Sequence, residues 1–138
     1  MLDELQDRLI RYLSRHNWAV LCSIGPDGPS SFLVHYRNSN LELECLLPRW
    51  ADASYHLWQD PRIHLVVPDP SSEGRRWLEY TGVAHIVEQP DWGKWSQELG
   101  DLSDPADLYL LVRVTPIRID LIDETKGWGR RETLEFSA

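Results

Sequence analysis

Two clusters of arginine and tryptophan are the first candidates for binding chemistry in this sequence. Residues 75–77 are Arg-Arg-Trp, and residues 128–131 are Trp-Gly-Arg-Arg. Guanidinium groups suit phosphates and carboxylates, and an indole can stack on a flat heteroaromatic ring. Each cluster could therefore hold an anionic aromatic ligand. The alternative is an exposed arginine pair beside a packed tryptophan.

A histidine in an apolar stretch is a third candidate. His35 and Arg37 lie in SFLVHYR, and residues two apart on a strand share a face, so either side chain could point at a ligand. The alternative for His35 is an ordinary hydrogen-bonded residue. The chain has five histidines without HxxxH or HxH spacing, and no nearby cysteine completes a zinc set, so we predict no metal site.

The segment 46–67, LLPRWADASYHLWQDPRIHLVV, is typical of a strand, a short helix, a proline stop and another strand. It offers Arg49 and Ser54 as hydrogen-bond donors for an anion, but it has no lysine, and it places Asp52 between them. If Ala51 opens the helix, the free N–H groups there could receive an anion. Alternatively, Arg49 and Asp52 form a solvated pair and the aromatic residues of the segment only pack.

The elements that must position these residues follow from apolar periodicity. Helical spacing of leucines over residues 1–16, with acidic residues first and basic residues last, indicates an N-terminal helix. The period then becomes that of strands, with a hairpin over 18–24 and 30–37 closed by GPDGP and a third strand over 41–47.

The second half of the chain predicts more strands, at 62–67, 75–87, 108–122 and 130–136. Gly82 should mark a bulge or bend, and Pro116 must lie at an edge or a bulge because it has no N–H to donate. The fold class is therefore mostly β. We expect an antiparallel barrel of six to seven strands over 18–136, carrying one or two short crossover helices, within a single domain spanning 1–138.

Composition excludes several partners. The net charge of -8 argues against a nucleic-acid partner and an anionic membrane surface, because both would repel an acidic chain. Cys22 and Cys45 lie in apolar strands without a CxxC spacing, which suggests buried thiols in a reducing compartment. No apolar run has the length of a membrane helix and the first residues are unlike a signal peptide. We therefore expect a cytoplasmic protein.

The order of the elements and four local signatures resemble the pyridoxamine 5'-phosphate oxidase-like family, the flavin-binding split barrels. The matching stretches are LCSIGPDGPSSFLVHY, LWQDPRIHLVV, LEYTGVAHIV and LVRVTPIRIDLID, which together cover nearly the whole chain in the family's order. The resemblance implies a split β-barrel and a homodimer, with FMN or another small molecule in the cleft between subunits.

The same resemblance implies where cofactor contacts should fall. Trp77 matches a position near the isoalloxazine ring, Trp128 and Arg131 match the C-terminal region that meets cofactor or substrate, and His35 matches the strand beside the ring. The family's phosphate-binding threonine, serine and cations correspond here to Leu47, Ala51, Asp52 and Ala53, none of which has a suitable side chain. Arg49 and Ser54 are the remaining candidates.

Two hypotheses follow from this mixture of likeness and departure. The first is an FMN-binding oxidoreductase with an unknown substrate, in which the cofactor supplies the redox chemistry. We do not expect a true pyridoxamine 5'-phosphate oxidase, because the resemblance implies a longer C-terminal motif where this chain has GRRETLEF. The alternative is a non-catalytic dimeric binding module that has lost the flavin phosphate site.

Overall fold

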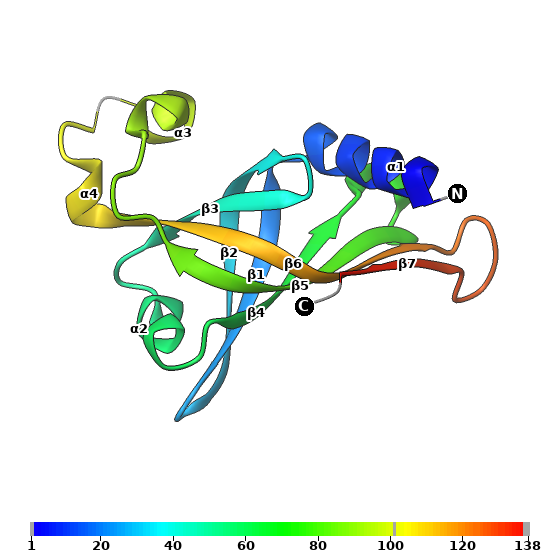
Figure 1. Cartoon of the computed structure of the whole chain (residues 1–138), viewed down its shortest axis with the longest axis horizontal. Helices are drawn as coiled ribbons and strands as arrows, with labels where there is room; N and C mark the ends of the chain where they lie inside the picture. The colour runs from blue at the N-terminus through cyan, green and yellow to red at the C-terminus, as the bar shows by residue number, and fades with distance from the viewer. Residues whose placement is uncertain (1, 101, 137–138) are drawn as a thin grey trace.

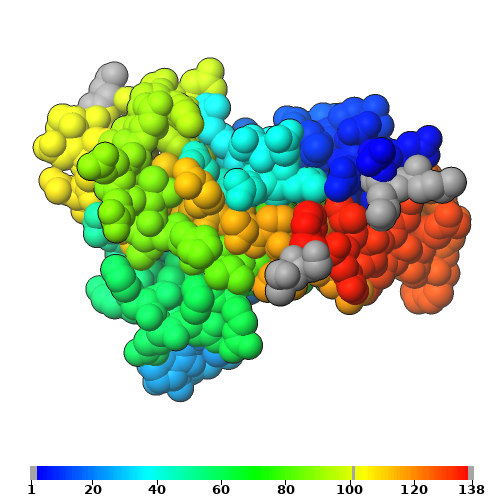
Figure 2. All heavy atoms as spheres, viewed as in Figure 1, coloured from blue at the N-terminus to red at the C-terminus, as the bar shows by residue number. Residues whose placement is uncertain are grey.

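The N-terminal helix is amphipathic and seals one side of the molecule. In the computed structural model, which describes residues 2–100 and 102–136, α1 spans Leu2–Arg15. Leu9 and Leu13 are fully buried, and Arg8 donates two hydrogen bonds of 2.6 Å to the carboxylate of Glu132. Figure 2 shows α1, in blue, lying against the red C-terminal strand. The helix is therefore held by its apolar face and by one charged clamp.

A tight hairpin follows. Strands β1 (Trp18–Gly25) and β2 (Gly28–Ser39) pair in antiparallel register up to Gly25 opposite Gly28, so only Pro26 and Asp27 form the turn. Gly28 has a φ of 111°, a conformation that favours glycine. The tip of this hairpin projects beyond the barrel, beside α2 (Figure 1).

Six strands close into a barrel, and a seventh extends it. The others are β3 (Glu42–Pro48), β4 (Arg62–Pro68), β5 (Arg76–Ile86), β6 (Tyr109–Asp123) and β7 (Arg131–Glu135). Their order is β3-β2-β1-β4-β5-β6-β7, and β3 also pairs with β6, which closes the barrel and leaves β7 outside it. The predicted mostly β, antiparallel barrel is confirmed.

The irregularity expected at Gly82 and Pro116 is present. The register between β5 and β6 shifts at Thr81/Gly82, and Gly82 lies opposite Pro116. A Cβ at Gly82 would come within 2.6 Å of the carbonyl oxygen of Thr115, so the strands approach too closely there for a side chain. The proline thus occupies the bulge, where its missing N–H costs no ladder bond.

Short helices fill the crossovers. The crossover between β3 and β4 contains α2 (Asp52–Gln59), as predicted, and η1 (Pro70–Ser72) precedes β5. Between β5 and β6 the chain forms η2 (Trp92–Trp95), α3 (Ser96–Leu99) and α4 (Pro105–Leu108). The last of these was not predicted; it begins on a proline, which suits the first turn of a helix. No helix in the described residues is long and apolar enough to cross a membrane.

The core has a main body and a smaller annex. The inward faces of the strands and the buried face of α1 form the main body, in which the hydroxyl groups of Tyr12 and Tyr36 donate 2.7 Å hydrogen bonds to backbone carbonyls. In the annex, Trp95 packs with Leu46 and Leu111 on the outside of the barrel. The segment containing η2 and α3 is thereby fixed against β3 and β6.

Candidate functional site

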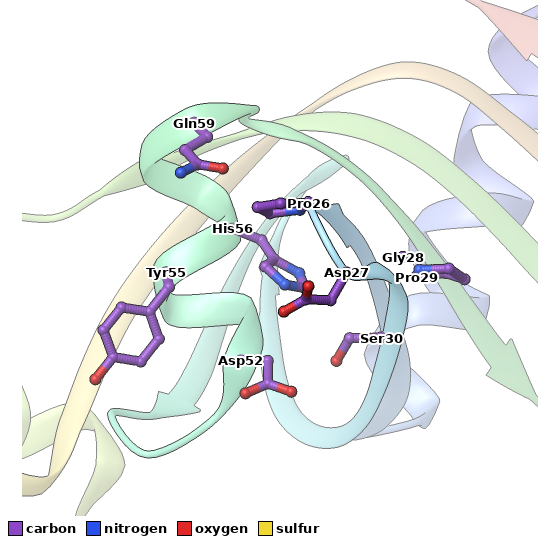
Figure 3. Close-up of a pocket in the computed structure, with 9 residues that line it drawn as sticks. All are labelled: Pro26, Asp27, Gly28, Pro29, Ser30, Asp52, Tyr55, His56 and Gln59. Carbon is purple, nitrogen blue, oxygen red and sulfur yellow. The ribbon is translucent and has the colours of Figure 1, made fainter.

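A cavity lies between the tip of the β1–β2 hairpin and α2, in the crossover that the sequence singled out. Its volume is about 340 Å³, within the size range of small-molecule sites. We call it the crossover pocket; its lining residues are Pro26, Asp27, Gly28, Pro29, Ser30, Asp52, Tyr55, His56 and Gln59. Figure 3 shows Asp27 and Ser30 of the hairpin facing His56 and Asp52 of α2, while Tyr55 turns outward.

His56 fixes one wall of the crossover pocket. Its Nδ1 lies 2.9 Å from the hydroxyl oxygen of Ser23, which is buried on β1. A Cβ at Gly25 would lie 2.1 Å from Cδ2 of His56, so the imidazole occupies the space that any other residue at position 25 would need. The glycine of the hairpin therefore serves to dock α2 on β1.

The Ser23 and His56 pair does not make a nucleophile. Ser23 is only 2 % exposed, so a substrate cannot reach its hydroxyl group. Among the described residues, no carboxylate forms an ion pair with His56 of the kind that orients a catalytic histidine. The pair anchors the helix.

The charge of the crossover pocket is acidic. Asp27 and Asp52 line it from opposite sides, and none of its lining residues is a lysine or an arginine. A phosphate carries between one and two negative charges near neutral pH and binds best to charged donors. The pocket therefore repels a phosphate group and favours a neutral or cationic one.

The positions that match the family's phosphate ligands are mostly core positions here. Leu47, Ala51 and Ala53 are fully buried in the main core. Asp52 alone is exposed, and it faces the crossover pocket. The residues present therefore do not fit an FMN phosphate, because three of the four positions point inward and the fourth is negative.

The two substitute donors lie outside the crossover pocket. The Nε of Arg49 donates a 2.7 Å hydrogen bond to the carbonyl of Ala106, which ties the crossover to α4. The hydroxyl of Ser54 lies within 2.9 Å of the carbonyl of Arg49 and 2.7 Å of that of Ala51, and Ser54 is only 6 % exposed. Neither residue lines the crossover pocket, and both stabilise the backbone at the start of α2.

His35 lies further along β2, away from the crossover pocket. Its ring packs at a tilt of 36° against Trp18 of β1, with centroids 3.5 Å apart. The Nδ1 atom is buried and has no hydrogen-bond partner in the protein. Burial lowers the pKa of His35, and the nearby carboxylate of Glu98 opposes that shift. The ring is therefore neutral near pH 7.

Trp77 and Arg131 share one face of the sheet. Trp77 is opposite Ile122 in the β5–β6 ladder, and Ile122 is opposite Arg131 in the β6–β7 ladder. They lie about two strand spacings, or ~10 Å, apart. The indole N–H of Trp77 donates a 2.9 Å hydrogen bond to Glu79. Trp128, in the turn between β6 and β7, is 95 % exposed and contributes to none of the described cavities.

The outer face of the sheet carries exposed apolar side chains. Leu33, Val20 and Val66 form one row across three strands, and Leu33 is 63 % exposed. The run LYLLVRV, residues 108–114, contributes little to this face, since Val112 and Val114 are buried within the chain.

Sequence reasoning missed the hairpin side of the site. Asp27 was read only as part of a turn, Ser30 only as the start of a strand, and His56 only as a helix residue. The signal was the turn GPDGP, whose two-residue loop brings an aspartate close to whatever packs on β1. Which element packs there is decided by the tertiary fold and could not be read from spacing.

No protein-family model matches this chain, and no curated protein matches it. Solved structures do match. A putative pyridoxamine 5'-phosphate oxidase from Listeria innocua is 20 % identical, with a TM-score of 0.70 over 85 % of this chain and 97 % of that one. General Stress Protein 26 from Bacillus anthracis str. Sterne is also 20 % identical, with a TM-score of 0.74 over 96 % and 99 %.

A third neighbour is a heme binding protein from Mycobacterium smegmatis, 18 % identical, with a TM-score of 0.68 over 94 % of this chain and 56 % of that one. The chain therefore has the split-barrel fold of pyridoxamine 5'-phosphate oxidase-like proteins, as its resemblance to that family implied. At these identities the likeness establishes the fold and leaves the chemistry to the residues of the site.

Proposed function

We propose that this protein is a dimeric split-barrel binding module that takes a small molecule and does not hold the phosphate of FMN in the family's way. The observation that carries the proposal is the charge of the crossover pocket, which Asp27 and Asp52 line and to which no lysine or arginine contributes. The free thiols of Cys22 and Cys45 support a cytoplasmic location.

The proposed dimer uses the outer face of the sheet. Ile24 and Leu33 are 64 % and 63 % exposed and Trp18 is 42 % exposed, which is costly for large apolar side chains unless a partner covers them. A second copy of the chain suits such a face, because a two-fold interface pairs one patch with itself. The cleft at its border would then be shared by two subunits.

The oligomeric state can be tested by introducing one charged residue into the proposed interface. We expect Leu33→Glu to convert a dimer into a monomer in light scattering, because it buries a carboxylate in the interface. Leu108→Glu is the matched control, since Leu108 is 50 % exposed on α4, away from this face. A wild-type protein that is monomeric at micromolar concentration would refute the dimer.

A flavin-dependent oxidoreductase is the second candidate. Trp18, packed against His35, and Trp77 place aromatic rings and hydrogen-bonding groups on the face where a flat ring could lie. Such a flavin would be held by its ring system, and the phosphate would contribute nothing. FMN remains a possible cofactor only in this weaker form.

A visible absorption spectrum of the purified protein separates the two candidates. We expect no co-purified flavin, and a titration with FMN should give a dissociation constant in the micromolar range or weaker, because charge-assisted hydrogen bonds worth about 1.5 to 3 kcal/mol each are absent. The same spectrum would reveal a bound haem. Nanomolar FMN binding would overturn the proposal.

A further inference from the structure

The outward side of α2 exposes large aromatic side chains. Tyr55 and Trp58 are 68 % and 74 % exposed, and Trp50, just before the helix, is 75 % exposed. Asp52, Tyr55 and Trp58 follow one another at every third residue, so each lies beside the next along the helix. We call these three residues the α2 ridge; Figure 3 shows Tyr55 turned outward. Exposed aromatic surface bordered by charged residues is typical of an interaction site.

A groove lies at the C-terminal end of the α2 ridge, between α2 and the end of β5. Its volume is about 330 Å³, within the size range of ligand sites. We call it the Trp58 groove; its lining residues are Leu57, Trp58, Ala84, His85, Ile86 and Glu88. It shares no lining residue with the crossover pocket, which lies on the other side of α2. The two cavities are therefore separate sites.

The Trp58 groove combines the groups that hold a basic side chain. Its apolar surface, from Leu57, Ala84 and Ile86, suits an alkyl stem. The indole of Trp58 suits a cationic head, and Glu88 adds a carboxylate. No lysine or arginine lines the groove, and within residues 2–100 and 102–136 Glu88 forms no ion pair. A guanidinium group would therefore meet both an aromatic face and an unpaired negative charge.

The backbone beneath the α2 ridge is firmly held. Nδ1 of His56 lies 2.9 Å from the hydroxyl oxygen of Ser23 on β1, and Nε of Arg49 donates a 2.7 Å hydrogen bond to the carbonyl of Ala106. These contacts fix α2 on the barrel from both of its ends. A partner would meet side chains on a fixed backbone, which lowers the entropic cost of binding.

Charge decides which partner suits this surface. Asp52 at one end of the α2 ridge and Glu88 beyond the other end are both exposed carboxylates. Arg49 and Arg62, the arginines nearest to α2 in the sequence, line neither the Trp58 groove nor the crossover pocket. A two-fold contact with a second copy would bring two acidic patches of a chain with a net charge of -8 together. A positively charged partner is attracted instead.

We propose that the α2 ridge and the Trp58 groove are the docking site for a basic segment of a partner protein, with one arginine in the Trp58 groove and a second beside Asp52. Asp52 and Trp58 are six helical residues, or ~9 Å, apart. Residues three apart in a polyproline II segment share a face and are separated by the same ~9 Å. Such segments dock on exposed aromatic rings, here that of Tyr55. An Arg-x-x-Arg segment therefore matches the surface, whether or not a small molecule occupies the crossover pocket.

Two fluorescent peptides test the proposal. The first is Gly-Arg-Pro-Pro-Arg-Gly, and in the second citrulline replaces both arginines, which keeps the shape of the side chains and removes their charge. Each is titrated into the full-length protein by fluorescence anisotropy at about pH 8, above the usual titration range of histidine. We expect the arginine peptide to bind at least about tenfold more tightly than the citrulline peptide, and added salt should reduce the difference.

Two exposed positions supply the diagnostic variants. Trp58→Leu keeps an apolar side chain but removes the aromatic face, and Glu88→Gln removes only the charge. Each should weaken binding of the arginine peptide about fivefold or more, while Trp58→Phe should retain more affinity than Trp58→Leu. Glu73→Gln is the matched control, because Glu73 is exposed and lines neither cavity. It should bind like the wild type, and all four variants should unfold at the wild-type temperature.

Several results would overturn the proposal. Equal affinity for the two peptides, or an equal loss in Glu73→Gln and Glu88→Gln, would show that only the net charge of the protein attracts the peptide. No binding of the arginine peptide at millimolar concentration would show that the surface has no such partner. A dimer that dissociates in Trp58→Leu would show that a second copy covers this face. Butylguanidinium binding as tightly as the peptide would assign the Trp58 groove to a free small cation.

Discussion

In the crossover pocket, Asp27 and Asp52 face a cavity without a cation, whereas beside η1, Asp69 and Asp123 flank one guanidinium group. There Arg76 donates hydrogen bonds of 3.0 Å to Asp69 and 3.1 Å to Asp123. We call these three residues the arginine cluster. Aspartate therefore has two roles in this protein. Beside Arg76 it helps to join β4, β5 and β6, and in the crossover pocket it sets the charge of an open cavity.

The pKa values of the arginine cluster show how fully its charges are matched. The hydroxyl of Ser71 and the guanidinium of Arg76 lower the pKa of Asp69 against the effect of burial. For Asp123, burial raises the pKa most strongly, but hydrogen bonds from Thr125 and Arg76 outweigh it and leave the pKa below its usual value. A carboxylate that is paired with a cation stabilises the fold, while an unpaired carboxylate can select a ligand by its charge.

Removing the cation of the arginine cluster should destabilise the fold. We expect Arg76→Ala to destabilise the protein by at least about 2 kcal/mol; the effect stays below that of a fully buried pair because Arg76 is one-third exposed. Denaturant unfolding measures it. Arg75→Ala is the control, since Arg75 is exposed and makes one 3.3 Å contact with a backbone carbonyl. Equal losses in the two variants would contradict this view of the arginine cluster.

Acid should act on the same cluster. Because the pKa values of Asp69 and Asp123 are lower in the folded protein than in the unfolded chain, their contribution is present above about pH 4 and is lost as pH falls through the folded values. Unfolding curves between neutral pH and pH 2 should show this decline. In Arg76→Ala the decline should be shallower, and an unchanged slope would count against the assignment.

Removing the two negative charges of the crossover pocket tests their effect on FMN binding. We expect Asp27→Asn with Asp52→Asn to tighten FMN binding by about tenfold, since two like charges no longer face the phosphate, and to leave stability nearly unchanged. Asp91→Asn with Asp104→Asn changes the net charge equally at exposed positions outside the crossover pocket. If that control tightens binding as much, the effect belongs to the net charge of the protein and not to the pocket.

The smallest expected effect concerns Ala51. It is the N-cap of α2, with φ of -71° and ψ of 141°, and it makes no side-chain cap hydrogen bond. We expect Ala51→Ser to raise stability by about 0.5 to 1 kcal/mol through a new cap, without tightening FMN binding, because this position is buried. Thermal unfolding and an FMN titration test both parts. Tighter FMN binding would restore Ala51 as a ligand position.

The sequence was most informative where local chemistry determines local structure. Gly82 and Pro116 predicted the bulge because neither residue suits a regular ladder, and GPDGP predicted the hairpin because only a tight turn accommodates it. The crossover pocket depends on which element packs on β1, and Gly25 accommodates His56 from a position 31 residues away in sequence. The spacing of residues along the chain does not predict that contact.

The same limit explains the site residues. Arg49 and Ser54 have the right chemistry for an anion, but neither lines the crossover pocket. The Nε of Arg49 donates to the carbonyl of Ala106, and the hydroxyl of Ser54 bonds to backbone carbonyls at the start of α2. His35 and Trp77 were expected near a ligand and lie on the outer face of the sheet, where their roles stay predictions. The absence of suitable side chains at 47, 51, 52 and 53 was the most useful observation, because once the family resemblance gave the positions it depended only on the residue types there.

The crossover pocket offers nothing to a phosphate, and two flavins that differ only in that group test this property. Riboflavin and FMN should be titrated into the apoprotein side by side, with dissociation constants taken from flavin fluorescence. We expect FMN to bind no more tightly than riboflavin, because Asp27 and Asp52 meet its phosphate. A preference for FMN of about a hundredfold or more, equivalent to at least one charge-assisted hydrogen bond, would contradict it.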